Sequence, residues 1–376
     1  MDAIARTETA IMQLCCLELP SELVIPAVLK QLRAVVPSGG STFFWCGQDY
    51  QVSNLYDDPF ESPEVVAFYL QEFYNRPERE LHAGFAYAFQ HYQGALDFGR
   101  ILSVDRRTYL NSDFYNLVLR PLHYADSLHL VVRALGRPLG DLAVWRGLND
   151  VAFTTREKRC LERLEPFIAH AADASKKPRE SQVTLVDEDE GTGLVIVNRA
   201  GNIQHISPQA RKLLFLATNP QIMTKTTHGE ALRLPTQIIQ LCWNLIAIFE
   251  GKQDNVAPPV YEHHNPWGRF VFRAYWLDNG NPLDSLIGIT IKHQVPLPVR
   301  VIGQLKRFRL SRRQMQICVL LAGGYSDANI AHAMNMTINT VITHNRRIYN
   351  KLNVHSRAEL VNKLLETRGL ATPMHT

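Results

Sequence analysis

Apolar residues near the C-terminus recur every three or four positions, which is the spacing of an amphipathic helix. The segment Ser311-Arg312-Arg313-Gln314 before them has the form of a capping box, and Gly323-Gly324 after them can end a helix in the left-handed conformation. We therefore predict a helix between these two signals. Its apolar face consists of Met315, Cys318, Val319 and Ala322.

Three further helices are predicted downstream, each preceded by a residue that can cap its first turn. Ser326, Thr337 and Ser356 are these caps. The pattern predicts a compact four-helix unit. Its remaining apolar positions are Ile330, Ala331 and Met334 in the second helix, Val341, His344 or Asn345, Ile348 and Leu352 in the third, and Leu360, Val361 and Leu364 in the fourth.

The third helix carries a second stripe on its free side. Asn and Arg can form paired hydrogen bonds with adenine and guanine edges, and Ile and the Thr methyl group can contact a thymine methyl. Arg347 and Lys351 flank the stripe and can neutralise phosphates, while Thr337 starts a helix whose amides can bind another. An ordinary exposed amphipathic helix has the same periodicity, so the pattern alone leaves both interpretations open. The stripe is Asn339, Ile342, Thr343 and Arg346.

The middle of the chain has the alternation of a mixed α and β domain. Residues 194–197 and 203–206 flank a predicted hairpin turn, and Ser207-Pro208 can start a helix. Residues 269–276 and 286–292 have the composition of strands from the same sheet. This order resembles the opening of a PAS-like sensor domain.

The first part of the chain also mixes strands and helices. It predicts a strand at 43–45, a helix at 63–74, a hairpin of 128–135 with 141–146 across residues 136–140, and a helix after Thr154. The order is similar to that of a GAF-like sensor. Residues 41–100 include 15 aromatic residues, which a plain aromatic core explains most simply, and a ligand pocket stays open.

Two breaks in composition indicate domain boundaries. One is the polar, charged stretch from 175 to 190, and the other is Val295-Pro296-Leu297-Pro298, whose prolines disfavour both helix and central strand. The predicted fold is a multidomain α+β chain with one or two sensor domains before an all-α four-helix domain. Its parts are a GAF-like domain at 1–175, a linker at 176–190, a PAS-like domain at 191–294, a linker at 295–309 and the helical domain at 310–370.

Charge is distributed unevenly between these parts. Residues 300–376 contain 12 Lys and Arg against three acidic residues, a net charge of +9. Because the whole chain carries +4, residues 1–299 carry −5. A small basic domain after a mildly acidic body indicates a polyanionic partner for that domain, although a solvated basic face has the same composition.

Other compositional signals narrow the class. The six cysteines are scattered without a C-x-x-C pair, and the histidines lack metal-ligand spacing, so we expect reduced thiols, no metal and no cofactor. The first 19 residues lack the apolar core of a signal peptide. The longest apolar run, 241–249, is half of a membrane span and contains Asn244. We expect a cytoplasmic protein with no membrane partner.

Residues 310–365 contain the motifs L-S-x-R-Q, G-x-S-x-x-x-I-A and T-x-x-T-V-x-x-H-x-x-x-I-x-x-K-L-x-V-x-S-R-A-E-L. This order and spacing resemble the LuxR-type (GerE) helix-turn-helix. The resemblance implies that the third helix enters the major groove and that Thr340, Val341, His344, Lys351, Leu352, Val354 and Arg357 occupy signature positions. Gln314 replaces the usual glutamate, and Ile342 replaces a common lysine, which removes one cationic contact. The expected DNA-binding residues are Thr337, Asn339, Thr340, Ile342, Thr343, His344, Arg346, Arg347, Lys351 and Arg357.

The leading hypothesis is a sequence-specific transcription regulator whose sensor domains control the helix-turn-helix. We expect double-stranded DNA as partner, a homodimer, a small-molecule effector in the sensor region and RNA polymerase as a further candidate partner. A phosphorylation-driven response regulator is disfavoured because the first part lacks the acidic pair, the phosphoacceptor aspartate and the later lysine of a receiver. No G-x-S-x-G, P-loop or H-E-x-x-H motif occurs, so we expect no enzyme. A scaffold or an enzyme with a DNA-binding tail remains the alternative.

Overall fold

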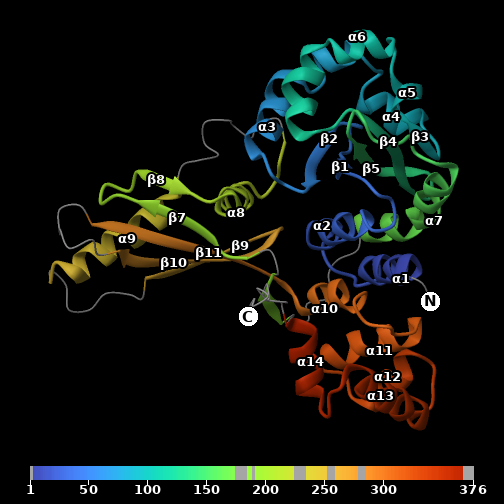
Figure 1. Ribbon diagram of the computed structural model, residues 1–376, viewed down its shortest axis with the longest axis vertical. Coiled ribbons are helices and arrows are strands. Elements are labelled where there is room, and N and C mark those ends of the chain that lie inside the picture. The colour runs from blue at the N-terminus through green and yellow to red at the C-terminus, as the bar shows by residue number, and fades with distance from the viewer. Residues whose placement is uncertain are drawn as a thin grey trace, which may run out of the picture.

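The computed structural model describes residues 3–173, 184–188, 191–223, 234–251, 259–277 and 285–366. Two sheet-containing domains and a helical domain follow one another along the chain (Figure 1). The second sheet extends from the first domain as an arm, and the helical domain lies beside α1, on the opposite side of the first domain from α6. The described part of the chain thus has the predicted α+β then all-α order.

The first sheet is antiparallel, with the strand order β2-β1-β5-β4-β3. Alternate residues of its strands point to opposite faces, and both faces are buried. The strands are β1 Gly40–Cys46, β2 Val52–Asp58, β3 Ala95–Asp97, β4 Asp126–Ala134 and β5 Arg137–Arg146.

Helices cover both faces of this sheet. The helices α1 Ala3–Cys15, α2 Ser21–Leu32 and α7 Thr155–Ala172 form one layer. A capping box of Thr154 and Glu157 starts α7, as the sequence predicts. The other layer contains α3 Pro63–Phe68, the π-helical turn Tyr69–Phe73, the 3-10 turn Pro77–Glu80, α4 Phe85–His91, α5 Phe98–Ile101, α6 Arg106–Leu110 and the short turns Tyr115–Leu119 and Arg120–Leu122.

The second sheet repeats the same order, β8-β7-β11-β10-β9, with β6 beside the end of β11. The helices α8 Pro208–Thr218 and α9 Thr236–Phe249 pack on it, and Ser207 caps α8 as predicted. The predicted hairpin is confirmed by β7 and β8. The strands are β6 Leu185–Asp187, β7 Gly193–Val197, β8 Ile203–Ile206, β9 Val260–Asn265, β10 Gly268–Leu277 and β11 Leu286–Pro296.

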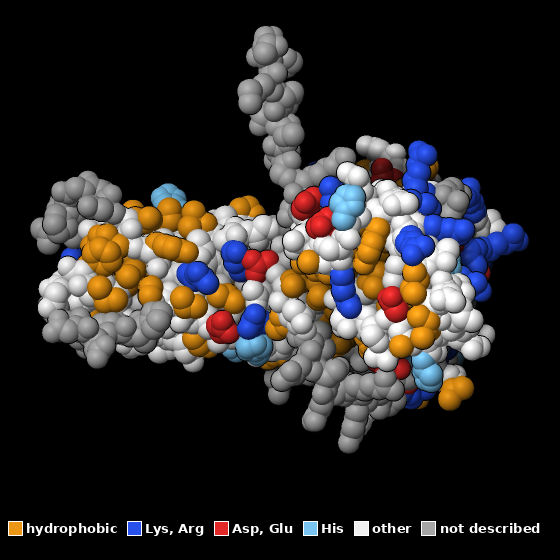
Figure 2. Space-filling view, turned by 90° about the horizontal axis from the view of Figure 1, so that it is seen from below, with side chains coloured by type: hydrophobic (Ala, Val, Ile, Leu, Met, Phe, Trp, Pro, Cys, Tyr) orange, Lys and Arg blue, Asp and Glu red, His pale blue; other side chains and the backbone are white. Residues whose placement is uncertain are grey.

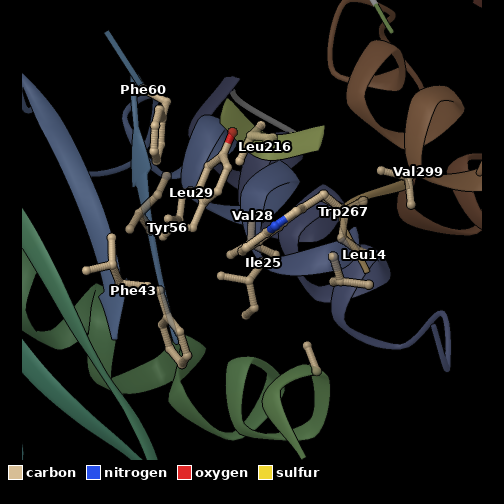
Figure 3. Close-up of a cluster of buried hydrophobic side chains, with 14 of the residues drawn as sticks. Leu14, Ile25, Val28, Leu29, Phe43, Tyr56, Phe60, Leu216, Trp267 and Val299 are labelled. Atoms are coloured by element: carbon tan, nitrogen blue, oxygen red, sulfur yellow. The ribbon is translucent and has the colours of Figure 1, made fainter. Parts of the chain in front are cut away.

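Aromatic side chains join the two sheet domains. The Trp267 ring lies 5.5 Å from the Tyr56 ring and 6.1 Å from the Trp45 ring, measured between centroids. Phe60 meets Phe215 of α8 at 5.5 Å. Figure 3 shows Tyr56, Phe60 and Trp267 in one cluster with residues of α2, so the two domains share a continuous apolar contact.

The helical domain contains the four predicted helices and one more before them. Ser311, Ser326, Thr337 and Ser356 each accept a hydrogen bond from a backbone amide of the first turn, which confirms the four predicted caps. The helices are α10 Leu297–Leu305, α11 Arg312–Ala322, α12 Asp327–Ala333, α13 Ile338–Leu352 and α14 Arg357–Leu365.

The predicted linker at 295–309 is wrong, because α10 occupies most of it. Pro298 lies in the first turn, where a missing backbone amide costs nothing and the fixed φ of proline suits a helix. Val301, Ile302 and Leu305 are buried, so α10 is a packed element. It contacts α1 and α2 of the first domain as well as α11 and α14.

Three other boundaries differ from the prediction. Strand β6 lies inside the linker predicted at 176–190, where it pairs with β11, and residues 176–183, 189 and 190 lie outside the described residues. The β4–β5 turn consists of Leu135 and Gly136, both with positive φ, so β5 begins at Arg137. The predicted helix at 63–74 changes to a π-helical turn after Phe68. The composition of these segments did not indicate where the strands and the helix begin and end.

The expectations for the cysteines and for membrane-spanning segments can be compared with the structure. The six cysteines are free thiols, and four of them are buried. Among the helices that the structure describes, none is both long enough and apolar enough to cross a membrane.

Candidate nucleic-acid interface

Helix α13 is held firmly on one side. Val341, Ile348 and Leu352 are buried against the neighbouring helices. Asn345 is also buried, and its Nδ2 donates to Asp327 Oδ1 of α12 at 2.9 Å. Of the two residues that the sequence left open, Asn345 takes the buried position and His344 is half-buried. These contacts fix the angle between α12 and α13.

The opposite side of α13 faces solvent. Asn339, Thr343 and Arg346 are exposed, and Ile342 between them is half-buried. Thr343 Oγ1 donates to the Asn339 carbonyl at 2.9 Å, which leaves its methyl group on the outer surface. Arg347 is exposed next to this row. The four predicted stripe residues therefore share one side of the helix, and three of them are exposed.

The start of α13 is organised by two threonines. Thr337 Oγ1 accepts from the Thr340 amide at 3.2 Å, and the two hydroxyls lie 2.8 Å apart. This cap satisfies one of the amides at the helix N-terminus and leaves others to meet an anion.

Two of the predicted DNA-binding cations make contacts inside the domain. Lys351 Nζ donates to the Arg309 carbonyl at 3.1 Å and to Gln314 Oε1 at 3.0 Å. Arg357 donates to the carbonyl of Leu321 in the last turn of α11 and to that of Tyr325, which lies between α11 and α12. Both side chains connect helices, so they stabilise the frame that carries α13.

Sequence reasoning missed the connecting role of Gln314. It completes the capping box by accepting from the Ser311 amide at 3.0 Å, and the same Oε1 accepts from Lys351. The departure from glutamate therefore keeps both hydrogen bonds, although it removes a negative charge beside Lys351. In the sequence, only the residue type at position 314 could have indicated this contact with Lys351.

Basic side chains gather on the helical domain. Arg312 and Arg313 at the start of α11 are exposed, in addition to Arg346 and Arg347. Figure 2 shows a concentration of Lys and Arg at one edge of the compact part of the molecule. The positive net charge of residues 300–376 thus corresponds to basic side chains on the surface of the helical domain.

Comparison with known proteins identifies the class of this domain. Residues 309–364 match the family described as "Bacterial regulatory proteins, luxR family". The C-terminal unit is therefore a helix-turn-helix domain of the luxR family.

Curated relatives match over the same domain. The segment is 46% identical over 52 residues to the response regulator protein VraR of Staphylococcus aureus, and equally to that of Staphylococcus epidermidis. The match covers 14% of this chain and 25% of the relative, so the chain spans a quarter of the length of the curated relatives that it matches.

Solved structures of VqmA are also similar in part. One is the Vibrio cholerae VqmA dimer in the absence of target DNA, with 11% identity, a TM-score of 0.17, and 47% of this chain and 82% of that chain covered. Another is a VqmA–ligand–DNA complex, with 14% identity, a TM-score of 0.20, and 47% and 83% covered. At these scores the chains do not superpose as whole folds.

Proposed function

We propose that this chain regulates transcription by placing α13 in the major groove of double-stranded DNA. Asn339, Ile342, Thr343 and Arg346 contact base edges, while Arg347 and the amides at Thr337 bind phosphates. Thr340 and Lys351 hold α13 in position through their hydrogen bonds, and Arg357 holds α14 against the end of α11. The observation that carries the proposal is the capped, one-sided packing of α13, which leaves Asn339, Thr343 and Arg346 exposed together.

The sheet domains control this domain through α10. Because α10 packs against α1 and α2 on one side and against α11 and α14 on the other, a change in the first domain changes where the helix-turn-helix lies. A small-molecule effector bound in the sheet domains supplies such a change by favouring one arrangement.

The regulator acts as a homodimer. The face of the second sheet away from α8 and α9 carries Leu194, Tyr275 and Leu277, which are 43%, 48% and 38% exposed. Figure 2 shows hydrophobic side chains gathered along the arm. Apolar surface of this kind favours contact with a second copy, and two copies place two α13 helices on two half-sites.

Selection of random duplex DNA by the full-length protein tests the proposal. We expect enrichment of one inverted-repeat motif at a fixed, moderate salt concentration. Arg346→Ala should weaken binding by about 1–3 kcal/mol and relax the preference at one base position. Lys363→Ala, on the exposed side of α14, is the matched control and should leave the motif unchanged. Selection without enrichment, or equal weakening by Arg346→Ala on every sequence, would contradict the assignment.

A further inference from the structure

Two isoleucines of α13 lie outside the hydrophobic core. Ile338, the first residue of the helix, is 49% exposed, and Ile342 is half-buried one turn later. Neither belongs to the apolar side chains that pack in or against the core in the described part of the chain, whereas Met336, Val341 and Ile348 around them do. The core of the helical domain therefore does not explain why positions 338 and 342 are apolar.

The start of α13 does not need an isoleucine at position 338 either. An apolar staple at a helix N-terminus uses the residue before the cap and the fourth residue of the helix. With Thr337 as the cap, these residues are Met336 and Val341, and both pack against the core. Isoleucine is also a weaker helix former than alanine or leucine, because its branched side chain loses rotamers in a helix. Neither the cap nor helix propensity accounts for Ile338.

The two isoleucines lie next to the polar residues that are proposed to contact base edges. Residues four apart project from the same side of a helix, so Ile338 and Ile342 form one apolar edge. Viewed along the helix, at about 100° per residue, Ile342 lies between Ile338 and Arg346. Asn339 lies beside Arg346, and Thr343 with its outward methyl group lies beyond both. The exposed side of α13 thus has a polar centre between two apolar margins.

The charge around the apolar edge fits nucleic acid better than another protein. Arg346 and Arg347 of α13 are exposed, as is Arg312 of α11, and residues 300–376 carry a net charge of +9. The centre of a protein–protein interface is depleted of charged residues, so an apolar edge beside exposed arginines is a poor centre for one. DNA offers phosphates to the cations and methyl groups to the apolar edge at the same time.

The chemistry of the major groove identifies which group an isoleucine can recognise there. Among the four bases of DNA, thymine alone presents a methyl group, at C5, whereas the other base edges present hydrogen-bond donors and acceptors. Removing one methyl-sized apolar group from water corresponds to about a fourfold gain in affinity. A branched apolar side chain at the surface of α13 can therefore distinguish thymine from the other bases without a hydrogen bond.

We propose that Ile338 and Ile342 together contact a thymine methyl group, which makes Ile338 a specificity-determining residue in addition to the four residues of the stripe. The inference rests on the proposed function, because it requires α13 in the major groove. It specifies the target chemically: a thymine stands beside the bases that Asn339 and Arg346 contact. The methyl group of that thymine contributes to affinity independently of the hydrogen bonds made by its neighbours.

Modified duplexes test this proposal with the full-length protein. A duplex selected from random DNA is synthesised with uracil in place of thymine, one position at a time, so that only the C5 methyl group is lost. We expect uracil at one thymine position to weaken binding about fourfold, and 5-bromouracil, whose bromine replaces the methyl group, to restore it. Ile338→Ala should reduce this ratio to less than about twofold. Ile4→Ala, which shortens an exposed isoleucine of α1, is the matched control and should leave the ratio unchanged.

The outcomes separate this inference from the proposed function. A selected duplex that binds equally well with uracil at every thymine position would overturn the inference and leave the proposed function standing. A full thymine preference in Ile338→Ala would also overturn it, because another residue would then contact the methyl group. Failure to select any duplex would overturn the proposed function and this inference with it. Circular dichroism checks that Ile338→Ala keeps α13, which alanine favours more than isoleucine does.

Discussion

The two sheets have the same strand order but differ in what covers them. With β6 left aside, each runs second, first, fifth, fourth, third strand of its domain. Between its third and fourth strands, the first domain inserts α5, α6 and two short turns, whereas Pro266 and Trp267 alone connect β9 to β10. The inserted segment supplies Phe98, Ile101 and Phe114 to a cavity of about 90 Å³ on one face of the first sheet. Topology alone thus does not create the cavity; the connections above the sheet do.

The other faces differ as well. Helices α1, α2 and α7 close the far face of the first sheet, while the described residues of the second domain place α8 and α9 on the same face. The first sheet is therefore covered on both faces, whereas one face of the second sheet is left open by the described helices. Each difference can be tested by changing matched residues in the two domains.

The largest expected effect is on packing. Phe43 of β1 is fully buried against α2, so Phe43→Ala should cost about 3–5 kcal/mol of unfolding free energy. Tyr275→Ala on the open face of the second sheet should change it by less than about 0.5 kcal/mol at dilute protein. Urea unfolding measures both. Equal losses would show that something covers the second sheet in solution.

The next effect concerns pH. Because burial raises the pKa of Asp57 to about 7 from 3.8, the folded state binds a proton that the unfolded state has lost between these values. The free energy of unfolding should therefore fall by on the order of a few kcal/mol as the pH rises from about 4 to about 7. Asp57→Asn should remove part of this slope in urea titrations at pH 5 and 8, while Glu78, whose pKa burial also raises to about 7, should keep the rest.

Asp187 of the second sheet provides the opposite control. Burial acts to raise its pKa, but bonds to Lys292 and Gln294 lower it below the ordinary value. Its contribution to stability is present above pH 3.8 and is lost as the pH falls further. Asp187→Asn should leave the change between pH 5 and 8 intact; a flattened slope would mean that Asp57 is not its source.

A smaller effect is expected on association. If the open face of the second sheet joins two copies, Tyr275→Asp should weaken self-association at least tenfold, or about 1.4 kcal/mol. Sedimentation equilibrium measures the change. Tyr50→Asp, which alters an exposed tyrosine of the first domain, is the control and should have no effect. An unchanged dimer with Tyr275→Asp would place the interface elsewhere.

The smallest effect concerns helix caps. Thr154→Ala should cost about 1 kcal/mol by removing the cap of α7. Ser207→Ala should cost more, because Ser207 Oγ accepts from both the Ala210 amide of α8 and the Leu194 amide of β7. Thermal unfolding compares the two variants. A smaller loss for Ser207→Ala would mean that water replaces the strand contact.

The helix-turn-helix was predictable because its signals are local. Ser311 and Gln314, or Thr337 and the apolar stripe of α13, lie within a few turns of each other, so periodicity and caps suffice. The exposed stripe followed from the same periodicity. The internal roles of Lys351 and Arg357 did not, since their partners lie 32 or more residues away.

The cavity was not predictable in the same way. Asp57, Glu78 and Asp141 lie in unrelated segments, and only the assembled sheet brings them to one space. Polar residues inside the apolar strands β2 and β5 were the available signal, but such residues also occur at strand edges facing water. Similarly, Pro296 and Pro298 indicated a break, although the chain uses them to begin a helix.

Strand β11 passes directly into α10, and this continuity has a mechanical consequence. Pro296 ends the strand and caps the helix, while the Leu297 amide still donates to Thr184 beside β6. Because no linker separates the two elements, a displacement of β11 would be carried directly to α10, and with α10 to the helices α11 and α14 that pack against it.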